Sequence, residues 1–358
     1  MHQRHIAIMG GGAAGYFGAI AAAEAGGPAV AVTLFEATAH PLAKVRVSGG
    51  GRCNVTHACF EPRELARRYP RGGRELVGAF SRWQPRDTVA WFTERGVALK
   101  AESDGRMFPV TDNSQTIIDC LQEAARRAGV LVRTNCGVKT VERAVRAAAS
   151  AAGPGEPTVP GTPASPPAAD PGSAYLLTLT TGETVAADRL LIATGGNRTN
   201  TGFGIARQHG HTIEPPVPSL FTFQIADPRL EGLAGLSVED AATSVKDTPL
   251  KERGPLLVTH WGLSGPAILK LSAWGARRLH DSGYRFTLRV NWAPQFNPET
   301  LRSALERARA ANPRKQVTTW CPVGLPLRLW EKLTGAAGLA PDAIWTGAGN
   351  TALRALAA

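Results

Sequence analysis

The sequence has few cysteines and no long apolar run, and these absences exclude several classes of protein. Its 358 residues include five cysteines without a CxxC pair, at Cys53, Cys59, Cys120, Cys136 and Cys321. This odd set in a long chain does not fit a small disulfide scaffold, and we expect no metal site. No stretch reaches the roughly 20 apolar residues that a membrane helix requires, and the N-terminus lacks the pattern of a signal peptide. We therefore expect a protein of the reducing cytoplasm.

The chain also lacks a dense basic run, although its formal net charge is +11 and its pI is about 9.9. The arginines are scattered, and aromatic residues are not interleaved with them as they are in many nucleic-acid-binding segments. We interpret the charge as background that helps to attract anionic ligands. The expected partner is a small-molecule substrate, and neither nucleic acid nor a membrane is expected. The oligomeric state is left open.

The stretch 5–36 has the pattern of a βαβ unit: an apolar strand, a glycine turn, an alanine-rich helix and a second apolar strand that ends in an acid. In the turn, the first glycine of Gly-x-Gly-x-x-Gly permits a tight bend, the second admits a pyrophosphate, and the third lets the helix pack closely on the strand. The diphosphate then lies at the helix N-terminus, and the acid accepts hydrogen bonds from a ribose. The predicted contacts are Gly10, Gly12, Ala13, Ala14, Gly15 and Glu36.

A second glycine-rich stretch, 48–54 (SGGGRCN), is predicted to be a loop whose backbone approaches a ligand closely. Basic side chains around it, including Arg46, would neutralise phosphate, and its N–H groups would form an anion nest. An ordinary surface loop is the alternative. The predicted contacts here are Lys44, Ser48, Gly49, Arg52, Cys53 and Asn54.

Several ordered motifs, spread over most of the chain, resemble a bacterial family of FAD-binding oxidoreductases of the aminoacetone-oxidase type, which includes a bile-acid-pathway reductase. The motifs are MGGGAAG, KVRVSGGGRCNVTH, GRMFPVTDNSQTIIDCL, LLIATGG and GPLLVTHWGLSGPAILKLS. The resemblance implies FAD as cofactor, with NAD(P)H as a candidate electron donor. It also implies backbone contacts to adenine at Val138 and a dinucleotide path lined by Ala193, Thr194 and Gly195.

The fold class that follows is α/β: a three-layer FAD/NAD(P)-binding Rossmann-like domain with inserted β-barrel-like and helical subdomains. We assign 1–214 to the FAD domain, with 144–173 as a disordered insertion, 215–296 to the β-rich insert and 297–358 to the helical insert. The family resemblance implies a return to the FAD domain after the inserts, and nothing of that kind follows Trp345. We therefore expect the flavin-ring side of the cofactor site to be incomplete.

Local patterns predict several further elements. The stretch 61–129 reads as mainly helical, with a helix capped by Ser114 and ended at Gly129, and a strand begins at Val130. Strands are predicted in SLFTFQI, LLVTHWG and YRFTLRVNW, and helices in ETLRSALERARA and LPLRLWEKLTGAAG. His260 and Ser264 suggest acid–base chemistry, but no orienting partner is identifiable.

The function predicted from the sequence is an FAD-dependent oxidoreductase, expected to be NAD(P)H-linked, that acts on an unidentified small molecule; no catalytic residue is assigned. Three alternatives remain open. A flavin disulfide reductase would use Cys53 and Cys59. A nicotinamide-only dehydrogenase would bind no flavin. A non-catalytic binding protein would bind a nucleotide without flavin reduction.

Overall fold

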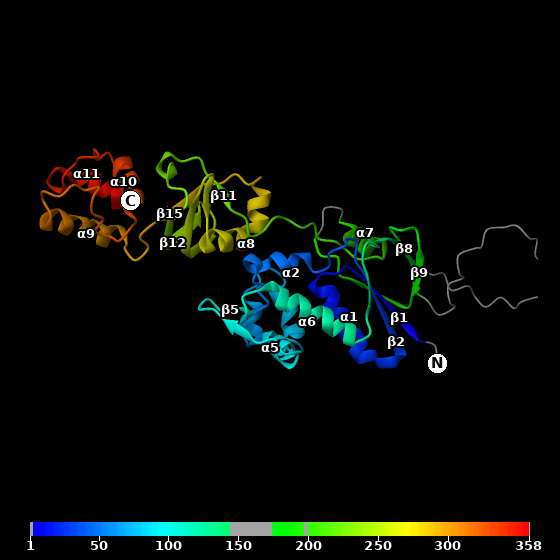
Figure 1. The fold of residues 1–358 in the computed structure, drawn as a ribbon. Coiled ribbons are helices and arrows are strands. Elements are labelled where there is room, and N and C mark those ends of the chain that lie inside the picture. Colours follow the sequence, from blue (N-terminus) through cyan, green and yellow to red (C-terminus); the bar gives the residue numbers. More distant parts are fainter. Residues whose placement is uncertain (1–2, 144–173, 197–199, 358) are drawn as a thin grey trace, which may run out of the picture. The chain divides into compact units, whose positions relative to one another are not determined.

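The computed structural model describes residues 3–143, 174–196 and 200–357, and the chain divides into two compact units, Met1–Glu214 and Pro215–Ala358 (Figure 1). The stretch 144–173, interpreted from its composition as an insertion, lies outside the described residues.

The first unit is built on a parallel sheet with the strand order β10-β1-β2-β6. Successive side chains of a strand point to opposite faces. In β1, Ile8 therefore joins one hydrophobic core, while Ala7 and Met9 join another. The strands of this sheet are β1 (Arg4–Met9), β2 (Val30–Phe35), β6 (Leu131–Arg133) and β10 (Arg189–Ile192).

Two further layers cover the faces of this sheet. The core that contains Ile8 is closed mainly by α1 (Ala13–Gly26), α5 (Pro85–Glu94) and α6 (Ser114–Arg127). The opposite core is closed by an antiparallel sheet and a helix: β7 (Val138–Arg143), β8 (Tyr175–Leu179), β9 (Thr184–Ala187) and α7 (Thr201–Gln208). The predicted three-layer Rossmann-like fold is confirmed.

The stretch between β2 and α6 adds short elements to the first unit. They are α2 (Ala43–Val47), β3 (Thr56–His57), α3 (Pro62–Ala66), α4 (Gly73–Phe80), β4 (Leu99–Ala101) and β5 (Arg106–Pro109). The predicted cap of α6 was wrong by one residue. Asn113 caps the helix by accepting the Gln115 N–H at 2.9 Å, whereas the Ser114 hydroxyl donates to the Arg46 carbonyl at 2.8 Å.

The second unit contains a five-stranded antiparallel sheet in the order β11-β14-β13-β12-β15. Helix α8 packs against β13 and β12. These elements are β11 (Phe223–Gln224), β12 (Ser237–Val245), β13 (Lys251–Thr259), β14 (Gly262–Ser264), α8 (Pro266–Asp281) and β15 (Leu288–Asn291). Strand β12 was not predicted, because Glu239 and Asp240 in its first half break the apolar pattern.

The helical part of the second unit has its own core around Trp345, which is fully buried. Its helices are α9 (Pro298–Ala311), α10 (Leu327–Ala336) and α11 (Asn350–Ala357). The two helices predicted here correspond to α9 and α10. Leu329 of α10 also belongs to the core of the β-sheet, so the helical part is anchored to the sheet.

None of the described helices combines the length and hydropathy needed to cross a bilayer. The described side chains also form no group of three or more His, Cys, Asp or Glu residues arranged as metal ligands. All five cysteines are free thiols.

Candidate functional site

The glycine turn between β1 and α1 brings three chain segments so close together that side chains would not fit. Gly10 has a φ of 104°, and a Cβ atom at this position would lie 2.6 Å from the Ala193 carbonyl oxygen. A Cβ atom on Gly15 would lie 1.8 Å from the Gly10 carbonyl oxygen. The motif therefore packs α1 against the end of β1 and the end of β10, as the sequence predicted.

The N-terminus of α1 is open to a ligand. Gly12 is the N-cap, no side chain caps the first turn, and a Cβ atom on Gly12 would meet no atom within 4 Å. Ala13 and Ala14 are exposed. The unpaired N–H groups and the positive end of the helix dipole make such a terminus a site for an anion.

Glu36 at the end of β2 lies beside this turn. Its Oε2 atom accepts the Gly11 N–H at 2.7 Å, and Oε1 accepts the N–H and the hydroxyl of Thr38, each at 2.8 Å. An ionised carboxylate has about four acceptor positions, so acceptor capacity for a ribose hydroxyl remains. The three bonds fix the orientation of the carboxylate, and Thr38 is a contact that the sequence analysis missed.

Val138 and the end of β10 lie at the same edge of the sheet as the glycine turn. The Cys136 N–H donates to the Glu36 carbonyl at 3.0 Å, which places the start of β7 beside Glu36. The Ala193 N–H donates to the Met9 carbonyl at 2.8 Å. The structure therefore gathers Glu36, Val138 and Ala193 around the carboxyl end of β1, where ligands of open α/β sheets bind.

Thr194 and Gly195 continue this edge toward α2. Lys44 of α2 donates from Nζ to the Gly196 carbonyl at 2.6 Å. A Cβ atom on Gly202 would lie 2.1 Å from Thr194 Oγ1, so the start of α7 packs closely on this segment. The ammonium group of Lys44 thus lies beside the predicted dinucleotide path.

The loop 48–54 follows α2 and is held in a left-handed backbone conformation. Gly49, Gly50 and Gly51 have φ values of 57°, 70° and 86°, and Cys53 has a φ of 62°. The Cys53 N–H closes the loop by donating to the Ser48 carbonyl at 3.0 Å. The glycines allow a bend that other residues would adopt only with strain.

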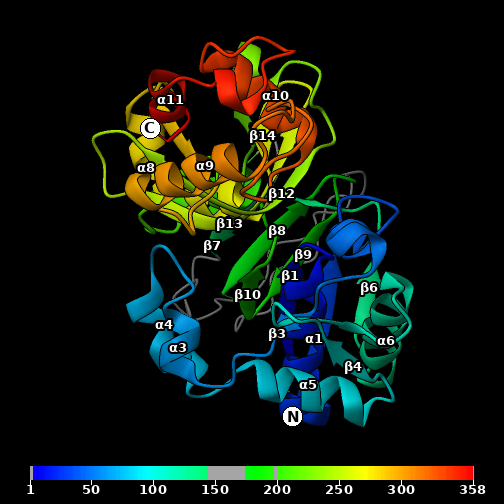
Figure 2. The same cartoon turned by 90° about the vertical axis from the view of Figure 1, so that its left-hand side faces the viewer.

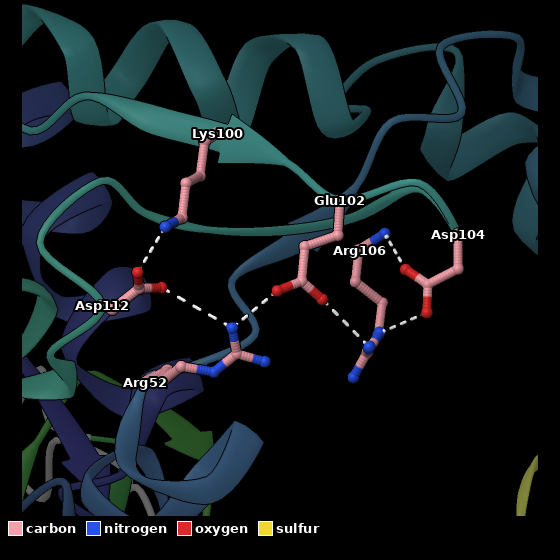
Figure 3. A network of polar contacts seen from close by, with 6 residues as sticks. All are labelled: Arg52, Lys100, Glu102, Asp104, Arg106 and Asp112. Carbon is pink, nitrogen blue, oxygen red and sulfur yellow. Dashed lines mark hydrogen bonds and ion pairs between the residues drawn. The ribbon is translucent and has the colours of Figure 1, made fainter.

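Arg52 of this loop turns toward carboxylates, although the sequence suggested a phosphate contact. Its Nη1 atom lies 2.6 Å from Glu102 Oε1 and 3.6 Å from Asp112 Oδ1 (Figure 3). Its guanidinium also stacks 4.0 Å from the centroid of the Phe108 ring. Arg106 also pairs with Glu102, at 3.0 Å. In this structure Arg52 thus tethers the glycine loop to the β4–β5 hairpin.

The same network changes the acidity of Asp112. A hydrogen bond from Lys100, together with the positive charges of Lys100 and Arg52, lowers the pKa of Asp112 below its ordinary value. Asp112 and Glu102 were missed by sequence reasoning, because they lie far along the chain from Arg52. The only local signal was the GRMFP motif, which contains Arg106.

The two cysteines considered as a redox pair are separate free thiols. Burial raises the pKa of the Cys53 thiol, and a hydrogen bond with Ser48 lowers it by less. Cys53 is therefore mainly protonated at neutral pH and is a weak nucleophile. Cys59 is partly exposed.

The second unit holds a cavity of about 1570 Å³, lined mainly by its sheet and by α10. Aromatic side chains of Phe223, Phe286 and Trp292 contribute to its wall. His260, in contrast, lies exposed in the turn between β13 and β14, and no hydrogen bond joins it to Ser264 among the described residues. The two residues do not form a catalytic pair here.

Two family models match the chain. The model described as the HI0933-like protein Rossmann domain matches residues 4–155. The model described as the HI0933-like protein barrel and H2TH domain matches residues 217–358. The two matches follow the two compact units of the fold.

Curated relatives match over most of the chain. The "Ribosomal RNA dihydrouridine synthase" of Escherichia coli (strain K12) is 30% identical over 342 residues, which cover 93% of this chain and 74% of that protein. The "3-dehydro-bile acid delta(4,6)-reductase" of Clostridium scindens is 25% identical over 341 residues, which cover 92% of this chain and 75% of that protein.

Among solved structures, the 3-ketosteroid-delta4-(5alpha)-dehydrogenase of Rhodococcus jostii is 14% identical, with a TM-score of 0.36. The match covers 55% of this chain and 47% of that one. This likeness is weak.

Proposed function

This chain belongs to the HI0933-like family of FAD-dependent oxidoreductases, and on that premise we propose that it reduces a carbon–carbon double bond conjugated with a carbonyl group. The proposed electron donor is NAD(P)H. It gives up a hydride, which FAD would pass on to one carbon of the double bond; a proton from water adds to the other carbon, and the substrate gains two hydrogen atoms. We further propose that the substrate is a uridine ring in RNA.

The observation that carries this proposal is the 30% identity, over 93% of the chain, to a protein named as a ribosomal RNA dihydrouridine synthase. Dihydrouridine is uridine whose ring double bond is saturated, and that bond is conjugated with a ring carbonyl. The second relative is named as a delta(4,6)-reductase and also saturates a double bond. The names of the two relatives agree on the type of reaction and differ in the substrate. They therefore support reduction of a double bond more strongly than they support any single substrate.

The residues of the first unit fit FAD. The uncapped terminus of α1 and the open space at Gly12 suit the diphosphate, and Glu36 suits the adenosine ribose. When bound, FAD supplies two-electron hydride chemistry. The chain's own residues orient the cofactor: Lys44 adds positive charge beside the dinucleotide path, and Arg52 fixes the glycine loop.

The net charge supports RNA as the proposed substrate, and the free thiols support a reducing cellular compartment. A net charge of +11 favours association with the RNA backbone, because basic side chains that neutralise phosphates release bound counterions. The expectation from sequence, which set nucleic acid aside, rested on the scattering of the arginines and stays untested. Five free thiols support the proposal of a reducing, cytoplasmic compartment.

The test uses the FAD-loaded full chain, NADPH or NADH, and a ribosomal RNA transcript made without modified bases. We expect oxidation of the nicotinamide and a uridine nucleoside that is heavier by two hydrogen atoms, detected by mass spectrometry of the digested RNA. The same protein stripped of FAD is the control. With dioxygen excluded, reduction of the bound flavin by NAD(P)H without any dihydrouridine would overturn RNA as the substrate and leave only the NAD(P)H-linked flavin chemistry standing.

A small conjugated ketone is the second candidate substrate. The 1570 Å³ cavity of the second unit favours it, because aromatic walls suit an apolar ring system. NAD(P)H oxidation with a panel of cyclic enones, followed by product mass, tests this candidate. Turnover of an enone in the absence of RNA would support it, and no turnover with any of them would count against it.

A further inference from the structure

The helices α3 and α4 and their flanking segments form a basic lobe, defined here as residues 60–86 (Figure 2). Helix α3 packs against α4, and α4 spans only about 12 Å. The lobe carries seven arginines against three glutamates. All seven arginines are exposed: Arg63, Arg67, Arg68, Arg71, Arg74, Arg82 and Arg86. The lobe thus concentrates exposed positive charge in one short stretch of the chain.

Much of this charge is not neutralised within the protein. Elsewhere in the first unit, arginines such as Arg95, Arg127 and Arg133 pair with carboxylates at 2.7 Å or less. Within the lobe, Arg67 pairs with Glu64. The structure gives no carboxylate partner among the described residues to Arg63, Arg68, Arg74 or Arg82. These guanidinium groups are available to an external anion.

The lobe also exposes aromatic rings beside these arginines. The exposed fractions of Phe60, Tyr69 and Trp83 are 38%, 43% and 42%. The Arg86 guanidinium lies 5.6 Å from the centroid of the Phe60 ring. Large aromatic side chains are usually buried, so three on one small lobe are a notable exception.

Exposed aromatic rings and arginines together fit single-stranded nucleic acid. Bases stack on aromatic rings and on guanidinium planes, and phosphates accept hydrogen bonds from arginine. An acidic polypeptide or an anionic membrane surface would use the charge but would leave the rings without a stacking partner. The combination therefore favours RNA over the other anionic partners.

We propose that the basic lobe binds a single-stranded segment of RNA and so holds the substrate on the enzyme. This inference rests on the proposed RNA substrate and adds the surface that recognises it. The arginines bind phosphates without sequence preference, and the exposed rings accept unstacked bases. The lobe is then a positioning surface, separate from the cofactor-binding residues of the first unit.

The test compares two double variants of the FAD-loaded full chain that lose the same charge. R68Q/R74Q removes two arginines of the lobe that have no carboxylate partner, and R126Q/R127Q removes two exposed arginines of α6 that pair with Glu123. Binding of a fluorescent oligouridylate is measured across a series of salt concentrations. We expect R68Q/R74Q to bind about tenfold more weakly and to reduce the slope of log affinity against log salt by roughly 1.4. The R126Q/R127Q variant should stay close to wild type.

Equal losses in both variants, or no loss in either, would overturn the proposal. Binding of poly-glutamate or anionic lipid vesicles by the wild type as tightly as RNA would also overturn it, because the surface would then select only for charge. The binding assay requires no turnover, so a failure of the RNA-binding proposal can be distinguished from a failure of the proposed reaction. Loss of RNA binding in R68Q/R74Q supports the lobe even if the wild type forms no dihydrouridine.

Discussion

The replacement Gly12→Ala separates the stability of the first unit from its ability to bind FAD. Gly12 has φ −85° and ψ −175°, which alanine adopts without strain, and its Cβ atom would meet nothing within 4 Å. Alanine is a poorer N-cap than glycine but restricts the unfolded chain more, and these effects offset one another. We expect the free energy of unfolding of the FAD-free protein to change by less than about 1 kcal/mol.

The cofactor meets the added methyl group directly. If the diphosphate lies at the N-terminus of α1, the methyl group occupies its space and removes one charge-assisted hydrogen bond, which costs about 1.5–3 kcal/mol. That cost corresponds to about a 10- to 150-fold loss of FAD affinity. Isothermal titration of FAD into FAD-free protein measures the affinity, and thermal unfolding of the same sample measures the stability.

The matched control is Gly335→Ala in α10, which also places a methyl group where no atom lies within 4 Å. This variant should bind FAD as wild type does. Wild-type affinity in Gly12→Ala would refute the placement of the diphosphate at α1. A large fall in the thermal midpoint of FAD-free Gly12→Ala would refute the claim that the position is open.

The remaining predictions concern packing, pH and thiols. Gly15→Ala should lower the stability of the first unit by about 1–3 kcal/mol, measured by denaturant unfolding, because its Cβ would lie 1.8 Å from the Gly10 carbonyl oxygen; an unchanged midpoint would contradict this. Hydrogen bonds from two arginines on α6 lower the pKa of Glu123 to about 2, so its stabilising effect is present above about pH 4.5 and lost as the pH falls toward 2. Glu123→Gln should therefore unfold at a lower temperature than wild type at pH 7 and at the same temperature near pH 2. A difference in thermal midpoint that stays the same at both pH values would refute the role of the Glu123 charge. Cys53→Ser and Cys59→Ser should each keep the NAD(P)H-dependent turnover of the wild type, followed by nicotinamide absorbance, and loss of turnover in both would favour the disulfide-reductase alternative.

The cofactor-binding part of the fold could be predicted from the sequence because its motifs lie close together in the chain. The glycines of 10–15 and the apolar strands around them lie within one short stretch, and Gly10 and Gly15 each have a steric reason in the structure. The position of Glu36 follows from the length of the same βαβ unit. Spacing alone was enough to predict that these groups meet.

The features that were missed depend on partners that are distant in the chain. Arg52 looked like a phosphate ligand beside three glycines, but Glu102 and Asp112 reach it from a hairpin that no local pattern connects to it. Strand β12 was overlooked because two acids interrupt its apolar pattern, and only its pairing with β13 and β15 explains it. The arginines of the basic lobe are different, because they lie together in the stretch 63–86, and what the sequence did not show was their exposure beside exposed aromatic rings.

The central position of β1 has a consequence for how the protein is made. β1 pairs with β2 and, on its other side, with β10, which begins at Arg189. During synthesis at about 5–20 residues per second, β1 leaves the ribosome roughly 10–40 s before its second partner exists. For that interval one edge of β1 has no neighbour, and an open strand edge is prone to pair with other chains. Slow synthesis or early termination before residue 192 is therefore expected to give aggregation, which a trigger-factor-type chaperone at the exit tunnel would suppress.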